Sequence, residues 1–137
     1  MKKNVAFLIL IATLISACAG TITLNGTTWE LISYGPVDNP TMALPDVDAT
    51  ISFDADDNLK GNVGCNGFFG EYEVSGNTIS TGPLASTMMA CETPQMDQEY
   101  AVLMLLNGTL DFESDGATLT IFSEDGTSAL HLTRITE

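Results

Sequence analysis

The chain has 137 residues, of which 18 are Asp or Glu and only 4 are Lys or Arg, so its formal net charge is −14 at pH 7. A chain this anionic repels nucleic acid and anionic lipid headgroups, and the composition therefore excludes nucleic acid as a partner. Its length suffices for one domain with one modest core and leaves no room for a second.

The first 17 residues have the layout of a secretory signal peptide. Two lysines at the start precede an apolar run over residues 5–15, and small residues follow it. The apolar run is too short to cross a bilayer as a mature helix. We therefore expect residues 1–17 to be removed, which leaves Lys60 and Arg134 as the only Lys or Arg against all 18 acids.

The signal ends in ISAC, residues 15–18, which resembles the lipobox of bacterial lipoproteins. This resemblance implies that Cys18 is the first mature residue and carries diacylglycerol, so that the protein is attached to the membrane through a lipid anchor. An ordinary signal peptide cleaved near Ala17 or Ala19 is the alternative. Because lipoproteins kept at the inner membrane usually have Asp at the position of Ala19, we expect an outer-membrane lipoprotein that faces the periplasm.

After a short tether over residues 18–24, residues 25–137 form one domain with the pattern of an antiparallel β-protein. Stretches of period-two alternation, rich in Thr, Ile, Val and aromatic residues, are interrupted by Gly, Asn, Asp and Pro. The predicted strands are Thr28–Tyr34, Ala49–Phe53, Leu59–Val63, Gly70–Val74, Thr78–Thr81, Thr109–Glu113, Thr118–Phe122 and Ser128–Ile135. Turn sequences such as SGN, SDG and EDG separate several of them. The fold class is therefore mainly β, a small barrel-like antiparallel meander of about eight strands.

One helix is predicted over about residues 94–107. Thr93 can cap its start, Pro94 suits the first helical position, and Asn107-Gly108 suits its end. Asp97 and Glu99 would place negative charge near the helix start. Met96, Tyr100, Leu103 and Asn107 share one face, and Val102, Leu105 and Leu106 lie close by, so the helix is apolar around much of its surface. The helix is expected to lie against the sheet or to plug one end of the barrel, although such a surface can also bind a partner.

Cys65 and Cys91 are the two thiols that remain once Cys18 is lipidated. In an oxidising periplasm they are expected to form a disulfide, which would close a loop of about 26 residues and contribute roughly 3.5 kcal/mol. A nucleophilic cysteine is the sharper alternative, but it needs a base, and His131 is the only histidine. His131 lies in an alternating strand, where a solvent-facing or locally bonded histidine is expected.

Metal and cofactor motifs are not found in the sequence. Asp54, Asp56 and Asn58 begin like a calcium loop, but Leu59 stands where the sharp turn needs glycine and Cys65 where a bidentate Glu is needed. One His and two separated Cys are too few for zinc. The chain also has no G-x-S-x-G motif and no phosphate-binding loop. We therefore expect no cofactor, no metal and no enzymatic activity, although a glycosidase-like pair of carboxylates is imaginable.

Several blocks together resemble the META domain, also called the HslJ-like family. These blocks are GTTWEL (26–31), GNVGCNGFFGEYEVSGNTIS (61–80), GPLASTMMAC (82–91), the helix with Glu99, LTIF (119–122) and ALHLTRI (129–135). The resemblance implies a small β-barrel-like protein with one helix, often an envelope lipoprotein associated with heat-shock, antibiotic-tolerance or virulence phenotypes, for which no reaction is established. It also implies a structural motif made of Gly64, Asn66, Gly70, Tyr72, Thr87 and Met89, in which Cys65 packs near or bonds to Cys91 and Asn66 bonds the backbone nearby.

Two classes of function follow from these observations. The first is a membrane-tethered, non-enzymatic envelope module that binds an unidentified envelope protein or serves stress and antibiotic tolerance. The second is a carrier of a small apolar ligand inside the barrel, although barrels of this size are usually filled by their own side chains. A cavity of a few hundred Å³ in the barrel interior would favour the carrier.

Overall fold

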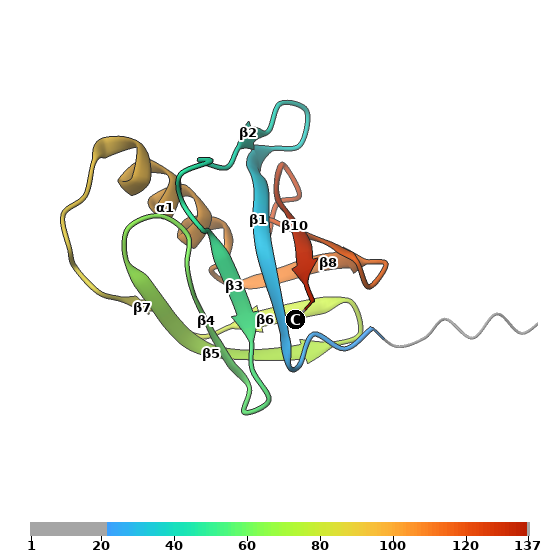
Figure 1. Cartoon of the computed structure of the whole chain (residues 1–137). Helices are drawn as coiled ribbons and strands as arrows, with labels where there is room; N and C mark the ends of the chain where they lie inside the picture. The colour runs from blue at the N-terminus through green and yellow to red at the C-terminus, as the bar shows by residue number, and fades with distance from the viewer. Residues whose placement is uncertain (1–21, 137) are drawn as a thin grey trace, which may run out of the picture.

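The computed structural model describes residues 22–136, so the predicted signal peptide and the predicted lipid site at Cys18 lie outside the described residues. Eight antiparallel strands form a barrel that is closed by pairing of the first strand with the last (Figure 1). In chain order they are β1 (Thr27–Pro36), β3 (Thr50–Phe53), β4 (Asn58–Asn62), β5 (Gly67–Ser75), β6 (Thr78–Thr81), β8 (Thr109–Ser114), β9 (Thr118–Phe122) and β10 (Ser128–Ile135). Each predicted strand overlaps one of these, so the predicted mainly β meander is confirmed. Two short strands, β2 (Thr41–Met42) and β7 (Ala85–Ser86), pair with β1 and β5.

The period-two alternation sets which side chains face the barrel interior. In β1, for example, Trp29 and Leu31 are buried while Glu30 and Ile32 are exposed. The indole Nε1 of Trp29 donates to the hydroxyl of Thr27 at 2.7 Å, so the polar atom of this buried ring is satisfied.

The barrel interior is filled by large apolar side chains from all around the sheet. Those that are almost completely buried include Trp29, Phe53, Ile51, Leu59, Ile79, Leu110, Leu119, Ile121, Leu130 and Leu132. Burying each such side chain contributes about 1.5–3 kcal/mol before the loss of conformational entropy. This contiguous core is the main source of stability.

The turn between β3 and β4 is the segment that begins like a calcium loop, and the structure shows a hairpin turn. One carboxylate oxygen of Asp54 accepts hydrogen bonds from the backbone N–H groups of Asp56 at 3.0 Å and Asn58 at 2.9 Å. The other carboxylate oxygen lies 3.2 Å from Nζ of Lys60. Asp57 adopts a left-handed conformation with φ of 61°, which lets the chain reverse.

These bonds predict how stability depends on pH. The N–H of Asn58, followed by the N–H of Asp56 and the ammonium of Lys60, lowers the pKa of Asp54 to about 2. Because the unfolded pKa is about 4, the stabilisation from Asp54 is complete above that pH and is lost as the pH falls toward 2. We therefore expect the difference in thermal midpoint between the wild type and Asp54→Ala to be constant near neutral pH and to shrink between about pH 4 and 2.

The control for this prediction is Asp56→Ala, which removes an exposed carboxylate of the same turn whose side chain accepts none of these bonds. At neutral pH the thermal midpoint of Asp56→Ala should lie closer to that of the wild type than the midpoint of Asp54→Ala does. A difference between wild type and Asp54→Ala that is as large at pH 2 as at pH 7 would contradict the assignment.

The single helix, α1 (Thr93–Leu105), lies close to the predicted range but begins differently. Its N-cap is Glu92, whose carbonyl accepts from the N–H groups of Gln95 and Met96, and no side chain caps the helix. The prediction that Thr93 is the cap was wrong, because Thr93 already has helical conformation. Likewise Asp97 lies beyond the first turn, which contains no acidic residue.

The helix also presents a different face to the barrel from the one predicted. The buried residues of α1 are Gln98, Glu99 and Val102, whereas Tyr100 is 70% exposed. The helix packs against the core through Val102 and Leu106, with Leu103 and Leu105 partly buried, whereas the expectation that Tyr100 packs inward was wrong. The carboxylate of Glu99 accepts from backbone N–H groups of Cys65 and Asn66, and the amide of Gln98 donates to the carbonyl of Val63 and accepts from the N–H of Leu44, which Met or Tyr side chains could not do.

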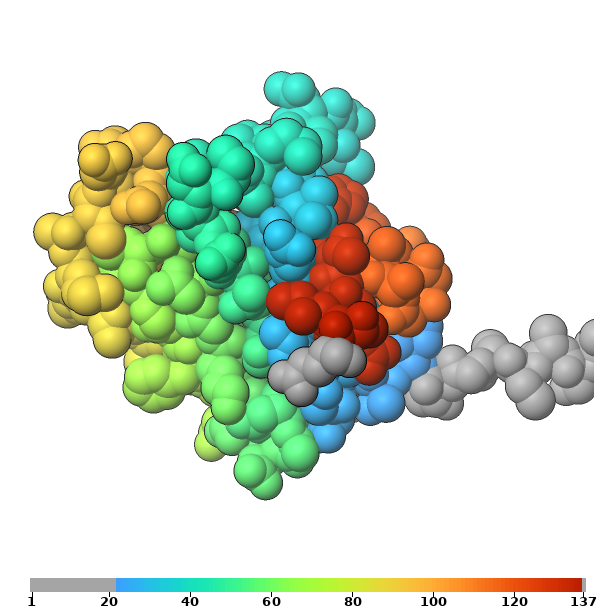
Figure 2. Space-filling model, viewed as in Figure 1, coloured from blue at the N-terminus to red at the C-terminus, as the bar shows by residue number. Residues whose placement is uncertain are grey.

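The helix and the described start of the chain lie on different sides of the barrel. In Figure 1 the residues that precede β1, in blue, lie across the barrel from α1, in yellow-brown. The same separation is visible in the space-filling view of Figure 2. Between residues 22 and 136 no helix has both the length and the apolar character needed to span a bilayer.

Candidate functional site

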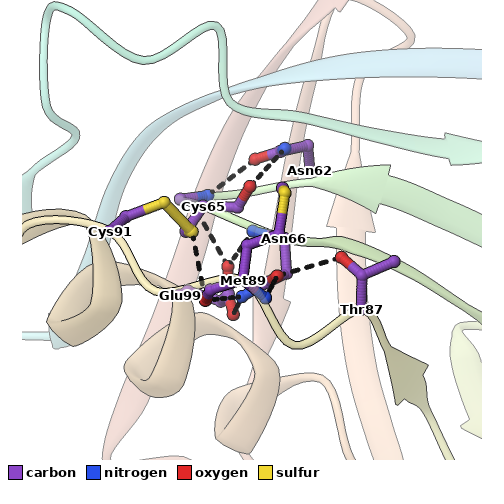
Figure 3. The surroundings of a disulfide bond; sticks show 8 residues. Asn62, Cys65, Asn66, Thr87, Met89, Cys91 and Glu99 are labelled. Carbon is purple, nitrogen blue, oxygen red and sulfur yellow. Dashed lines mark hydrogen bonds between the residues drawn. A yellow bond between two sulfur atoms is a disulfide. The ribbon is translucent and has the colours of Figure 1, made fainter.

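The glycine-rich block after β4 folds into a tight corner over one end of the barrel, residues Asn62–Asn66, beside α1 (Figure 3). The amide of Asn62 holds this corner from within, because its Oδ1 accepts from the N–H of Gly64 at 3.0 Å and its Nδ2 donates to the carbonyl of Cys65 at 3.2 Å. A Cβ at Gly64 would lie 2.3 Å from the carbonyl oxygen of Gln95. Only glycine lets the corner approach the helix backbone this closely.

Glu99 of α1 is the anchor of this corner. Its carboxylate accepts hydrogen bonds from the backbone N–H of Cys65 at 2.8 Å, from the backbone N–H of Asn66, and from Nδ2 of Asn66 at 2.9 Å. The side chain is 6% exposed, so these three donors replace water around a buried carboxylate. Glu99 therefore ties the helix to the corner.

Asn66 links the corner to the segment that leads into the helix. Its Oδ1 accepts from the N–H of Met89 at 2.6 Å and from the hydroxyl of Thr87 at 2.9 Å, and its Nδ2 also donates to the carbonyl of Met89 at 3.3 Å. Asn66 is 2% exposed, and every polar atom of its side chain has a partner. The predicted role of Asn66 in bonding nearby backbone agrees with this geometry.

The predicted disulfide is present in the structure. Cys65 and Cys91 are joined with their Cα atoms 5.9 Å apart, which is within the usual range for a disulfide. Cys65 is buried in the corner, whereas Cys91 is exposed in the segment just before α1. A covalent bond and the hydrogen bonds of Asn66 therefore hold the same segment against the same corner.

Gln98 gives α1 a second polar anchor, which the sequence analysis missed. Its Nε2 donates to the carbonyl of Val63 and its Oε1 accepts from the N–H of Leu44, both at 2.8 Å. The side chain is fully buried. The available signal was the spacing of Gln98, Val102 and Leu106, which places these three residues on one helical stripe.

The remaining residues of the predicted motif, Gly70 and Tyr72, lie along β5, and His131, for which no site role was expected, lies on β10. Gly70 lies under Leu84, where a Cβ would come within 2.7 Å of a Leu84 methyl group. Tyr72 packs edge-to-face on Phe53 with ring centroids 5.0 Å apart, and its hydroxyl donates to the carbonyl of Asp54 at 3.1 Å. His131 is half-buried in β10, with Nδ1 3.4 Å from the hydroxyl of Thr120.

Titration of Tyr72 is also affected by its surroundings. Burial, followed by the carboxylates of Asp57 and Asp54, raises the pKa of the Tyr72 hydroxyl. The hydroxyl therefore stays protonated at neutral pH and serves as a donor, which is a structural role. Neither Gly70 nor Tyr72 contacts the corner, so the predicted motif divides into one group around Asn66 and a second group along β5.

The chemistry of the corner is that of a structural joint. The Glu99 carboxylate that faces it already accepts three hydrogen bonds, and Cys65 is bonded to Cys91. Within residues 22–136, no group of three or more His, Cys, Asp or Glu side chains is arranged to hold a metal ion. The corner therefore positions the outer surface of α1, and that surface is the candidate binding site.

The outer flank of α1 borders a groove with a volume of about 670 Å³. One wall is the segment 81–86, and the other is formed by Met96, Tyr100, Leu103 and Met104 of α1. Tyr100 and Met104 are 70% and 58% exposed. The groove thus carries the apolar helical face that the sequence predicted to be packed against the sheet.

Comparisons with known proteins agree on the fold. An NMR structure of a protein from Burkholderia xenovorans superimposes with a TM-score of 0.71 at 23% identity, covering 83% of this chain and 85% of that chain. The crystal structure of a DUF4847 family protein from Bacteroides vulgatus ATCC 8482 superimposes with a TM-score of 0.60 at 15% identity, covering 83% and 96%. At these identities the two matches show a shared fold and nothing further. No curated protein matches the chain.

The family comparison covers almost all of the described residues. The family model described as META domain matches residues 22–135, which include every strand, the corner and α1. The resemblance found in the sequence blocks is thereby confirmed. This chain belongs to the META domain family.

Proposed function

We propose that this protein is a membrane-tethered binding domain of the bacterial cell envelope that uses the outer flank of α1 to hold a protein partner. The tether is supported by the signal-like residues 1–17 and by the lipobox-like sequence that ends at Cys18. Ala19 favours the outer membrane, with the domain facing the periplasm. A role in envelope stress or antibiotic tolerance is part of the same proposal.

The observation that carries this proposal is the exposed apolar groove on a domain with a large excess of acidic residues. Its helix wall contains Tyr100 and Met104, each more than half exposed, next to Met96 and Leu103. Apolar area of this kind is costly to leave in water and marks interaction sites. The helix α1, which forms one wall of the groove, lies across the barrel from the described start of the chain, so a tethered domain could present its outer flank to partners (Figure 1).

A binding role is favoured over catalysis by the state of the reactive groups. Cys65 is in a disulfide, Glu99 is bonded by three donors, and His131 lies in a strand beside a threonine. None of these three residues therefore forms a nucleophile–base pair with another. We therefore propose that the domain catalyses no reaction.

The alternative of an apolar-ligand carrier is less well supported. Trp29, Phe53 and the aliphatic side chains of the strands fill the barrel interior, and the groove beside α1 lies at the surface. A carrier needs an interior cavity of a few hundred Å³. The packing therefore favours a surface binding site.

The proposal is tested by crosslinking in intact cells. A photo-crosslinking residue is placed at Tyr100, and in a matched variant at Thr133, which is exposed on β10. We expect a discrete adduct from position 100 only, and less of it when Cys18→Ser removes the lipid, as checked by mass spectrometry of the mature N-terminus. Equal capture from both positions, or none from either, would count against a partner site on α1.

A further inference from the structure

The groove beside α1 has one wall made of backbone. The segment 81–86 includes β7, which pairs with β5 along one edge only. In this ladder Ser86 lies opposite Phe68, while the N–H of Thr87 donates to the carbonyl of Gly67 at 3.0 Å. Since antiparallel residues alternate between bonded and non-bonded pairs, the N–H and C=O of Ser86 point away from β5.

These outward backbone groups have no partner within residues 22–136. Outside the strand ladders, no hydrogen bond within residues 22–136 involves the N–H or C=O of Ser86, or those of Leu84, which precedes β7. Both residues line the groove. A free strand edge beside an apolar groove is the arrangement that binds an added strand, with backbone bonds supplying affinity and side-chain contacts supplying selectivity.

The opposite wall suits apolar side chains of varied shape. Met96 and Met104 flank Tyr100 on α1, and methionine adapts to different partners because it is unbranched and flexible. The helix cannot close onto the strand edge by itself, because Gln98 and Glu99 fix it to the corner. The groove is therefore held open by the same bonds that anchor the helix.

The charged residues around the groove favour a positively charged partner. Of the two cations in residues 22–136, Lys60 pairs with Asp54 at 3.2 Å and Arg134 lies over the ring of Trp29, so neither borders the groove. Glu124 and Asp125 border an adjoining depression of about 400 Å³ that shares Met104 and Asn107 with the groove. Lysine or arginine side chains of a partner would find complementary charge there.

We propose that this groove binds an extended, basic protein segment, which adds to the free edge at Leu84 and Ser86 as an extra strand and lays alternate apolar side chains on the α1 flank. The inference rests on the proposed function and specifies its partner. An amphipathic helix, or a small apolar ligand, would use the Met and Tyr side chains without the strand edge.

The test uses the folded domain and a synthetic probe, an end-capped peptide of alternating valine and lysine about eight residues long. We expect binding at low salt that weakens as salt is added. Replacing lysine by glutamate should abolish it. Methylating the backbone nitrogens on one edge of the peptide should weaken it about tenfold, because strand pairing is blocked while charge and side chains remain.

Variants of the protein locate the site. Tyr100→Ala and Met104→Ala should weaken binding of the peptide, whereas Met42→Ala, which trims an apolar side chain that is 65% exposed on β2, should not. Ser86→Pro removes the outward N–H without touching the bonds between β7 and β5 and should also weaken binding. An amide chemical shift of Ser86 that moves on titration of the wild type gives a readout that needs no variant.

These experiments test strand addition separately from the proposed function. If the methylated and unmethylated peptides bind equally, or if the amide of Ser86 does not move, strand addition is wrong. If a helical peptide of the same composition binds more tightly than the extended one, strand addition is also wrong. In either case capture from position 100 in cells would still support a partner site on α1, and its loss would remove the proposed function as well.

Discussion

Glu99→Ala is expected to lower the free energy of unfolding by about 4 kcal/mol, because it leaves three buried donors without an acceptor. These donors are the backbone N–H groups of Cys65 and Asn66 and the side-chain amide of Asn66. Glu99→Gln should cost about 2 kcal/mol. Its amide oxygen can still accept from the two backbone groups, but its NH₂ would face the Nδ2 donor of Asn66.

Urea unfolding of the two variants measures this series, with Asp97→Ala as the matched control on the exposed side of the same helix. The control should change stability by less than about 0.5 kcal/mol. Equal effects of Glu99→Ala and Asp97→Ala would mean that the carboxylate of Glu99 does not hold the corner. Because the corner positions α1, we also expect Glu99→Ala to weaken capture of a partner from position 100.

Removal of the disulfide is expected to lower the free energy of unfolding by about 3.5 kcal/mol, since the bond closes a 26-residue loop in the unfolded chain. The double variant Cys65→Ala, Cys91→Ala and the reduced wild type should show losses of similar size. Cys91 is exposed, so a reductant can reach the bond in the folded protein. For a domain of this size such a loss is a large share of the total stability.

Chemical denaturation with and without a reductant checks this prediction. The reductant should destabilise the wild type and leave the double variant unchanged, which serves as its control. The folded state should persist after reduction, because Asn66 still bonds Thr87 and Met89 across the same contact. A wild type whose unfolding midpoint is the same with and without reductant would show that the bond does not contribute.

The sequence by itself determined the barrel. Side chains of a strand alternate between two faces, so burial of Trp29 and Leu31 and exposure of Glu30 follow from local order alone. Turn residues such as Gly76, with φ of 62°, marked the hairpins in the same local way. The pairing of Cys65 with Cys91 was also predicted from the sequence, on the expectation that Cys18 carries lipid and that the compartment is oxidising, which leaves one choice.

Tertiary structure alone decided which face of α1 is buried and why two glycines are needed. A Cβ at Gly61 would lie 2.0 Å from the carbonyl oxygen of Thr50, and a Cβ at Gly64 would clash with the backbone of α1. Both clashing groups are distant in sequence, so only the folded structure shows that these two positions require glycine. The helix turned Gln98 and Glu99 inward, and left Tyr100 exposed, since unpaired backbone N–H and C=O groups of the corner and of Leu44 would cost more than exposed apolar area. Helical periodicity records which side chains share a face, whereas the choice between faces depends on the hydrogen-bonding groups that the rest of the fold presents to the helix.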